Sequence, residues 1–478
     1  MNAALTLHVL GGLLLFLAAT LLTPIPFSIW YRDGQWLWFL LSAGITAGVG
    51  GWLLRRFSSR DEVTLREGFA IVTFAWLAFA LFGGLPYVLS RTLPNPADAF
   101  FESMSGFTTT GASVFTNIEA VPASILFWRA LTQWLGGMGI IVLSLAILPL
   151  LGVGGMQLFE AEAPGPTADR LTPRIADTAR LLWGVYAFIT AAGIVLLWVG
   201  EMDFFDSVCH TFTAISTGGF STRNASLGAY GTYSQIVLIV VMVLGGANFS
   251  LHYYALRGRV LGYWRSDECR FYLFLLVGIT LAVFLVNWMN YENPLINLRD
   301  SAFTVTSVLT TTGFATADYE RWPFASQGLL VALMFIGGCT GSTAGGLKAV
   351  RITLLVKHAF LQLTRLIHPR QVLVLKLDHR PVPGDIMQDV LGFTVLFLGV
   401  LLIAGLLVAA SGSDLLTAST AALACLTTVG PGLGGVGPMD NYASLPAFAK
   451  LVLSLTMLLG RLEVSTVLVL LFASFWKK

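Results

Sequence analysis

The stretch CLTTVGPGLGGVGP, at Cys425–Pro438, places five glycines and two prolines between two strongly apolar segments. Irregular backbone at membrane depth is tolerated only where protein buries it or where it lines a water-filled cavity. Three other stretches resemble it: FTTTGAS at 107–113, ISTGGFS at 215–221 and LTTTGFAT at 309–316. Repetition at a near-constant spacing indicates a repeat architecture. Four similar loops can surround one axis, so this motif decides the fold that we expect.

The composition places these loops in a membrane protein. The chain has 478 residues, of which 56% are hydrophobic and 11% are charged, whereas soluble domains carry about a quarter charged residues. Apolar runs long enough to cross a bilayer as helices recur from end to end. The first run, from about Leu5, is interpreted as a retained helix and not as a signal peptide. We expect ten spans, near 5–30, 36–54, 68–90, 124–150, 179–200, 233–256, 271–289, 326–363, 386–410 and 446–475.

Each glycine-rich loop follows a short apolar segment of about 12 residues, too short to cross a bilayer and typical of a re-entrant pore helix. The predicted fold is therefore an all-α polytopic membrane protein. Four pseudo-symmetric helix–pore helix–loop–helix repeats surround one central pore, preceded by two extra helices. The expected divisions are 1–60 for the two extra helices, then 61–155, 156–260, 261–380 and 381–478 for repeats 1 to 4.

The four loops are the candidate ion-binding site. Backbone carbonyl oxygens of such loops can replace the hydration shell of a cation, and glycine supplies positive-φ backbone conformations. A single copy would be interpreted as a plain glycine-rich turn, but four copies in matched contexts favour a selectivity filter. Aligned on the first glycine of each motif, the filter residues are Thr109, Thr110, Gly111, Ser216, Thr217, Gly218, Thr311, Thr312, Gly313, Thr428, Val429 and Gly430.

An aspartate precedes each loop, at Asp98, Asp206, Asp300 and Asp414. These carboxylates could concentrate cations at the pore mouth, but we favour a role in capping the short helices. The basic residues indicate the orientation. Twenty of the 28 lie in one set of loops, with Arg129 and Lys450 assigned to the alternate set. The positive-inside rule places the first set, and both termini, in the cytoplasm.

The motifs TTTGAS, STGGFS, TTTGFA and TTVGPGLG, the loop GGCTGSTAGG and the late LLGRLE together resemble the Trk/Ktr/HKT superfamily of potassium transporters. Within it the chain is most similar to the TrkH type of membrane subunit of bacterial Trk uptake systems, over essentially its whole length. The resemblance implies a potassium-channel-like pore, K+ as the only bound metal, no other cofactor, a homodimer in the bacterial inner membrane, and a cytosolic nucleotide-binding regulatory ring of the TrkA type. Glycine at all four aligned positions favours K+ over Na+.

Two further features concern gating. The resemblance assigns a gate to the intramembrane loop Gly337, Gly338, Cys339, Thr340, Gly341, Ser342, Thr343, Ala344, Gly345 and Gly346. Five of these ten residues are glycine, which predicts that the loop breaks the helical run near 326–363. Close helix packing through small residues is the alternative to a gate. Arg461 lies within the last apolar run, where a charge is costly. We expect it to face the pore below the filter. The alternatives are a structural salt bridge, or Glu463 in that role.

The predicted function is K+ uptake across the plasma membrane, and the alternative is a secondary transporter that couples K+ to H+ or Na+. We expect no enzyme activity, because no catalytic constellation is present. The pattern G-x-G-x-x-G at Gly432, Gly434 and Gly437 lacks the strand and helix context of a dinucleotide site. The six histidines and the four isolated cysteines show no metal-ligand spacing, and neither a nucleic acid nor a nucleotide is expected on this chain. Membrane lipid surrounds it.

Overall fold

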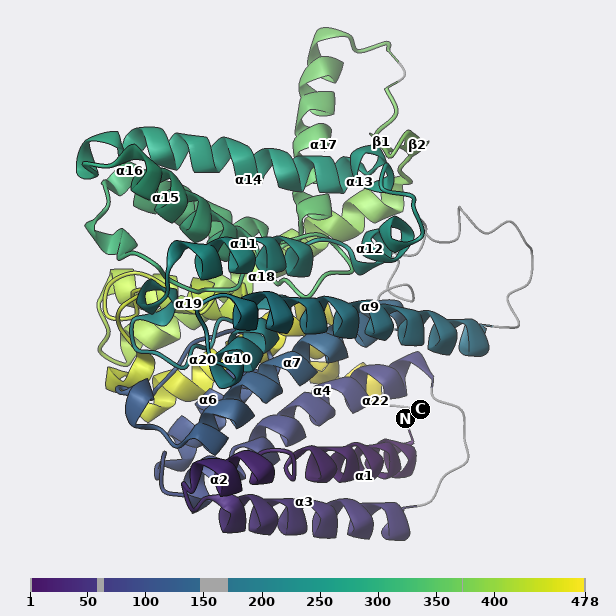
Figure 1. Cartoon of the computed structure of the whole chain (residues 1–478). Coiled ribbons are helices and arrows are strands. Elements are labelled where there is room, and N and C mark those ends of the chain that lie inside the picture. The colour runs from purple at the N-terminus through teal and green to yellow at the C-terminus, as the bar shows by residue number, and fades with distance from the viewer. Residues whose placement is uncertain (1, 58–63, 147–170, 372, 477–478) are drawn as a thin grey trace.

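The computed structural model describes residues 2–57, 64–146, 171–371 and 373–476. The expected divisions at 60/61 and 155/156 lie outside these ranges, as do four of the twenty basic residues assigned to the cytoplasm, Arg60, Arg170, Lys477 and Lys478. The regular elements of the described residues are almost all helices (Figure 1). One exception to the all-α expectation is a small antiparallel hairpin of β1 (Lys376–Leu377) and β2 (Arg380–Pro381).

The helices follow the predicted order of four similar units. Before them come α1 (Ala3–Thr20), α2 (Ile25–Tyr31) and α3 (Trp36–Arg56). Unit 1 has α4 (Leu65–Gly83), α5 (Leu85–Leu89), α6 (Pro96–Phe107), η1 (Ile118–Ala120) and α7 (Ala123–Ala146). Unit 2 has α9 (Leu171–Val199), α10 (Phe204–Ile215), η3 (Ser226–Ala229), α11 (Thr232–Gly246), α12 (Phe249–Leu256) and α13 (Gly262–Arg265).

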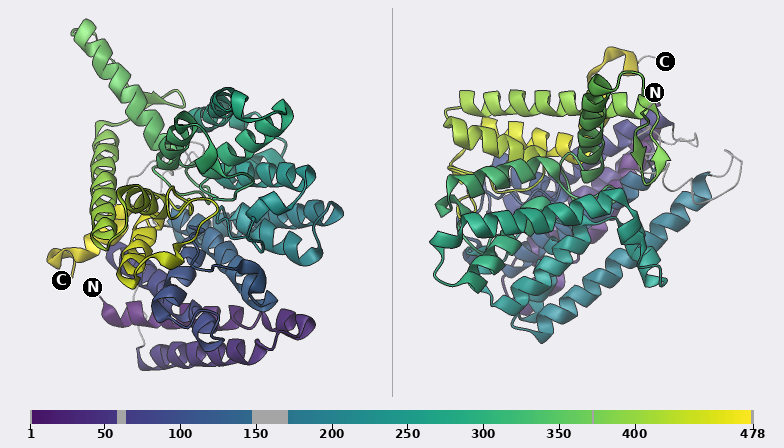
Figure 2. Two further views of the ribbon diagram at one scale, coloured as in Figure 1. Left: turned by 90° about the vertical axis from the view of Figure 1, so that its left-hand side faces the viewer. Right: turned by 90° about the horizontal axis from the view of Figure 1, so that it is seen from above.

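Units 3 and 4 repeat this order. Unit 3 has α14 (Asp267–Val286), η4 (Trp288–Asn290), α15 (Pro294–Leu309), η5 (Tyr319–Arg321), α16 (Phe324–Ile336) and α17 (Ala349–Ile367). Unit 4 has α18 (Gly384–Ala410), α19 (Leu415–Leu426), η6 (Tyr442–Ser444), α20 (Ala447–Arg461), α21 (Val464–Leu468), η7 (Val469–Leu471) and α22 (Ala473–Trp476). The units lie side by side, and α17 projects away from the rest (Figure 2).

The short helices α6, α10, α15 and α19 begin at polar caps. The caps are Asn95, Asp203, Asn293 and Asp414, each of which accepts a hydrogen bond from a backbone N–H of the first turn. Such a bond satisfies one of the donors that a helix start leaves unpaired. Capping by the predicted aspartates is therefore right only for Asp414. Asp98 instead pairs with Lys450, Asp206 with Arg223 and Asp300 with Arg299.

Three of the second long helices are broken, although the hydropathy pattern predicts continuous spans in units 2 and 4, and only the glycine-rich loop of unit 3 predicts a break. α11 and α12 meet at 107°, and α20 meets the segment Val464–Leu471 at 115°. In unit 3 the loop 337–348 separates α16 from α17. Glycines lie at or just before each break, and glycine weakens a helix by about 1 kcal/mol relative to alanine. The unit 1 counterpart, α7, is unbroken from Ala123 to Ala146.

By length and hydropathy, six helical segments among the described residues could cross a membrane, or eight if each bent pair is counted as one span. Ten were expected. The other two expected spans correspond to α7, which continues to the edge of the described residues, and to α16, which has only 13 residues. α1 begins, and α22 lies, at the same end of the molecule (Figures 1 and 2).

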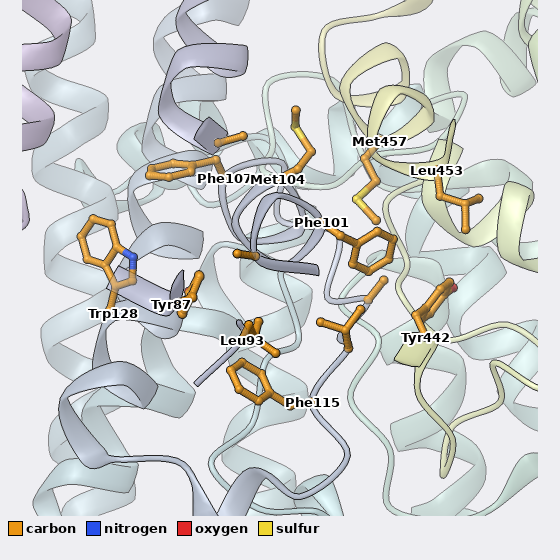
Figure 3. Packing of buried hydrophobic residues seen from close by; sticks show 14 of the residues in the cluster. Tyr87, Leu93, Phe101, Met104, Phe107, Phe115, Trp128, Tyr442, Leu453 and Met457 are labelled. Carbon is orange, nitrogen blue, oxygen red and sulfur yellow. The ribbon is translucent and has the colours of Figure 1, made fainter. Parts of the chain in front are cut away.

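The buried core joins unit 1 to unit 4. Figure 3 shows the aromatic side chains of α6 and their neighbours. Phe101 of α6 packs against Tyr442, with ring centroids 5.3 Å apart, and Trp128 of α7 donates through Nε1 to the carbonyl oxygen of Gly83 at 2.9 Å. Each short helix contacts the second long helix of the preceding unit: α10 with α7, α15 with α11, α19 with α16, and α6 with α20. These contacts close the four units into a ring.

Candidate functional site: a ring of four loops

The four loops share one backbone conformation directly after the short helices. Thr109, Thr217, Thr311 and Thr428 all have a positive φ, at 53°, 53°, 56° and 56°. A non-glycine residue in this left-handed region costs roughly 1–2 kcal/mol. Two residues further on, a glycine again has a positive φ, from 79° to 96°: Gly111, Gly219, Gly313 and Gly430. The same strained turn is therefore built four times.

This geometry corrects the predicted alignment of unit 2. The positive-φ glycine there is Gly219 and not Gly218. The hydrogen bonds agree, because the N–H of Gly218 bonds to Thr213 O at 2.8 Å, as that of Thr110 bonds to Ser105 O at 2.9 Å. Gly218 is thus the counterpart of Thr110, Thr312 and Val429. The predicted filter residue Ser216 is the C-cap of α10, equivalent to Thr108, Thr310 and Thr427.

The four loops touch one another in a closed circuit. A Cβ atom added to any of the four glycines would collide with a backbone carbonyl oxygen of the next unit. Measured from that added Cβ, the distances are 2.3 Å at Gly111 to Gly218 O, 1.8 Å at Gly219 to Thr312 O, 2.0 Å at Gly313 to Val429 O, and 2.7 Å at Gly430 to Thr110 O. The circuit runs from unit 1 through units 2, 3 and 4 and returns to unit 1. All four glycines also line a single cavity of about 90 Å³.

Predicted gate residues lie directly against the positive-φ threonines of this ring. Within the loop 337–348, Thr343 Oγ1 donates to the carbonyl oxygens of Ile215 and Gly245 at 2.9 and 3.0 Å. Thr217 Oγ1 lies 3.3 Å from Thr343 Oγ1. The N–H of Gly345 donates to Thr311 Oγ1 at 2.7 Å. The loop therefore contacts the positive-φ threonines of two units.

Other contacts of the loop 337–348 fix it to neighbouring helices. The N–H of Cys339 donates to Gly246 O at 2.8 Å, which caps the end of α11. Glu268 of α14 accepts from the N–H of Thr340 at 2.6 Å and from that of Val350 at 3.2 Å. Its carboxylate thus holds residues on both sides of the glycine-rich stretch.

Arg461 ends α20 and is only 3% exposed. Its Nη1 donates to Thr343 O at 2.6 Å and its Nη2 to Gly136 O at 3.2 Å. It lines a cavity of about 20 Å³ together with residues of the loop 337–348, Lys348 and Glu463, room for about one water molecule. Among the described residues its Nε has no partner, and the expected alternative of a salt bridge is formed instead by Glu463, which pairs with Arg351.

Three residues beside the ring, Arg129, Glu102 and Gln133, were not predicted as part of the site. Arg129 was assigned to an outer loop, but it lies in α7 and is 1% exposed. It pairs with Glu102 of α6, with Nε and Oε1 2.8 Å apart. Gln133, one turn further along α7, bonds to the loop of unit 2. A signal was present, because a charged and an amide side chain, Arg129 and Gln133, stand four residues apart in a largely apolar helix.

Fold and site together define a polytopic helical membrane protein in which four pore-loop units enclose one axis. A family model described as TrkH, cation transport protein, matches residues 40–478. The chain belongs to this family.

Named relatives agree over the full length. The chain is 41% identical to "Trk system potassium uptake protein TrkH" of Halomonas elongata, covering 100% of both chains. It is 42% identical to the protein of the same name from Escherichia coli K12, covering 98% of this chain and 99% of that one. It also matches the crystal structure of the potassium transporter TrkH from Vibrio parahaemolyticus, with a TM-score of 0.92, 36% identity and 100% of both chains covered.

Proposed function

We propose that this protein takes up K+ across the inner membrane of a bacterium through a channel-like pore. The observation that carries the proposal is the closed circuit of four positive-φ glycines against four carbonyl oxygens. Backbone oxygens held in a ring can take the place of the water around a dehydrated monovalent cation. The potassium uptake named for the relatives supports K+ as the ion. The filter consists of the twelve predicted residues with Gly219 in place of Ser216.

Gly111→Ser tests the filter. A serine Cβ at residue 111 would lie 2.3 Å from Gly218 O, so the circuit must deform at the contact between units 1 and 2. A deformed ring with an added hydroxyl fits the smaller Na+ better, and we expect the K+/Na+ flux ratio in reconstituted liposomes to fall by about tenfold, equivalent to about 1.4 kcal/mol. An unchanged ratio in folded variant protein would remove the filter assignment.

The alternative function is a secondary transporter that couples K+ to H+ or Na+. Such carriers are commonly built from two inverted repeats, whereas four units in the same order around one axis favour a channel-like path. Flux distinguishes the two. Channel-like conduction makes K+ flux follow its own electrochemical gradient alone. K+ accumulation driven by an imposed H+ or Na+ gradient would instead establish coupling.

The predicted gate residues 337–346, which lie in the loop 337–348, are proposed as the gate, with Arg461 as their anchor. The support is its position: it bonds to the threonines at the inner end of the ring and leaves about 20 Å³ beside Arg461. A loop there obstructs an ion that has passed the filter. Departure of the loop from Thr217 and Thr311 would clear the way. Close packing of small residues explains the glycines near α11, but not the hydrogen bonds to the filter threonines.

The remaining proposals concern assembly. The homodimer rests on the family resemblance alone. Cytoplasmic termini and regulation by a cytosolic nucleotide-binding ring of the TrkA type agree with the basic character of the loops that follow α12 and α17. The mass of the purified protein by light scattering tests the dimer. Co-purification with such a ring, and its loss when Arg365 and Arg370 are replaced by glutamate, tests the regulator. Protease access to the hairpin β1–β2 in sealed vesicles tests the orientation.

A further inference from the structure

The second long helix of unit 1 differs from the other three at two buried positions. In units 1, 2 and 4 this helix carries a glycine against the C-terminal end of the preceding short helix. A Cβ at Gly136 would lie 2.1 Å from Phe107 O, and one at Gly460 would lie 1.8 Å from Leu426 O. Gly245 and Gly337 occupy the same place in the motif of units 2 and 3.

Counting back from this glycine by seven and by three residues gives the same pair in three units. The pairs are Leu238 and Met242, Leu330 and Met334, and Leu453 and Met457. All six side chains are buried. In α7 the two positions hold Arg129 and Gln133. Residues four apart lie on one face of a helix, so the junction between units 1 and 2 is polar where the matching surfaces of the other units are apolar.

Gln133 binds the loop of unit 2 from behind. Its Nε2 donates to the carbonyl oxygen of Gly218 at 2.7 Å, and its Oε1 accepts from the N–H of Phe220 at 3.1 Å. A Cβ at residue 218 would lie 2.4 Å from Gln133 Cδ. Unit 2 therefore carries glycine where the other units carry threonine or valine, because the space behind the loop is occupied by the Gln133 amide.

Arg129 joins the same junction from the side of unit 1. Its Nε pairs with Glu102, its Nη2 donates to Ser113 Oγ at 3.1 Å, and its Nη1 donates to Ser221 O at 3.3 Å. Glu102 also accepts from the N–H of Val114 at 2.9 Å. One guanidinium thus bridges the residues that follow the ring glycines in the loops of units 1 and 2. Arg129 and Glu102 are both buried, so the two charges compensate each other with little screening by solvent.

A matching contact exists in unit 2. Glu102 lies nine residues before Gly111, and His210 lies nine residues before Gly219. His210 Nε2 is 3.0 Å from Ser221 Oγ, just as Glu102 accepts from Ser113 Oγ at 3.0 Å. In units 3 and 4 the equivalent positions hold threonine and alanine, at residues 304 and 421. Thr304 Oγ1 has no hydrogen-bond partner among the described residues.

We propose that Arg129, Gln133, Glu102 and His210 form a polar staple that holds the first and second walls of the filter together and so determines how well K+ is distinguished from Na+. The inference rests on the pore function proposed above. The four side chains act as positioning residues through Gly218, Phe220, Ser113 and Ser221. A ring held at fixed size discriminates between cations by size, and one relaxed wall lets the remaining oxygens close around the smaller ion.

Gln133→Met tests the staple, because it installs the residue that the other three units carry and nearly conserves volume. In liposomes containing the full-length protein, we expect the K+/Na+ flux ratio to fall about fivefold, the effect of about one net hydrogen bond. The K+ concentration at half-maximal flux should rise, with maximal flux affected less. Ser221→Ala should lower the ratio in the same direction, and it serves if Gln133→Met does not fold.

Two control variants sit at matched positions without a staple: Met457→Leu in α20, and Thr304→Val in α15. Both should keep the parental ratio. The staple is overturned if folded Gln133→Met and Ser221→Ala keep it too, or if the controls lower it equally. If Gly111→Ser lowers the K+/Na+ flux ratio but Gln133→Met and Ser221→Ala do not, the staple is wrong and the pore function stands. Absence of K+ uptake by the parent protein removes the pore function and the staple with it.

Discussion

At the scale of single residues, the ring depends on backbone that most side chains resist. Four threonines adopt positive φ, and the hydroxyls of Thr108 and Thr110, and of Thr310 and Thr312, bond to each other at 2.8 Å behind the loops. These bonds, together with those from loop N–H groups back to the short helices, offset the strain. The motif letters located the loops correctly. They misplaced unit 2 by one residue, since STGG offers two glycines and only tertiary contacts decide between them.

A comparison of Gly219→Ala with Gly412→Ala distinguishes the effect of backbone strain from the effect of lost contacts within the ring. Gly412 also has a positive φ, of 104°, but a Cβ there would meet nothing within 4 Å. Both changes impose strain of roughly 1–2 kcal/mol, yet only Gly219 lies against a carbonyl oxygen of the ring. We expect Gly219→Ala to lower K+ flux by about tenfold or more and Gly412→Ala to leave it near the parental value. Equal loss in both variants would show that strain alone is responsible. Flux per folded protein is the measurement.

At the scale of elements, hydropathy predicted where helices lie but not where they bend. An apolar run continues through Gly245 and Gly460 without a change that a window average detects. At Gly245 and Gly460 the last carbonyl oxygens of the short helices lie within contact distance of the glycine, but Gly136 makes the same approach in the unbroken α7, so this contact alone does not break a helix. Such an approach depends on packing between segments about thirty residues apart, which a periodicity argument does not contain. The glycine-rich loop of unit 3 was predicted to break its helix, and this prediction is confirmed.

The anchoring of the loop 337–348 by Arg461 leads to an element-scale prediction. Arg461→Ala removes the donors to Thr343 O and Gly136 O together with a positive charge in the proposed ion path. We expect K+ flux to rise severalfold, because a hydrogen bond from a charged group contributes about 1.5–3 kcal/mol. Arg461→Lys retains the charge but cannot donate to both carbonyls as a planar guanidinium does.

The two variants separate two mechanisms. If anchoring matters, Arg461→Lys behaves like Arg461→Ala. If electrostatic repulsion of cations matters, Arg461→Lys behaves like the parent. Parental flux and parental control by a regulatory partner in both variants would mean that Arg461 only supports packing. Liposome flux with and without the partner distinguishes these outcomes.

At the scale of the whole molecule, the ring is completed only when unit 4 meets unit 1. Gly430 lies against Thr110 O, Phe101 packs on Tyr442, and Lys450 bonds to Asp98 at 2.7 Å. Sequence repetition predicted four units around an axis. It did not determine the order in which they touch, because a period carries no information on neighbours in space. These contacts span more than 300 residues of chain.

An ion bound in the ring should therefore stabilise the entire fold. A ligand that binds only the folded state stabilises it by about 2.7 kcal/mol at one hundred times its dissociation constant. We expect K+ to raise the melting temperature of the detergent-solubilised protein by a few degrees relative to equal concentrations of choline, with Na+ giving less. Gly219→Ala should abolish the difference, and Gly412→Ala should preserve it. Identical melting in all three salts would contradict ion binding at the ring.

The contact between the loop 337–348 and the broken end of α11 has a consequence for water. Gly245 O and Gly246 O have lost their helical partners and accept hydrogen bonds from Thr343 and Cys339 instead. If the loop leaves, these carbonyls need new donors, and water entering the vacated space is the donor at hand. Wetting of the conduit and departure of the loop are then a single event. A partly displaced loop would leave these carbonyl oxygens without hydrogen bonds and without water. Conduction should therefore switch between a closed and an open level without intermediate levels.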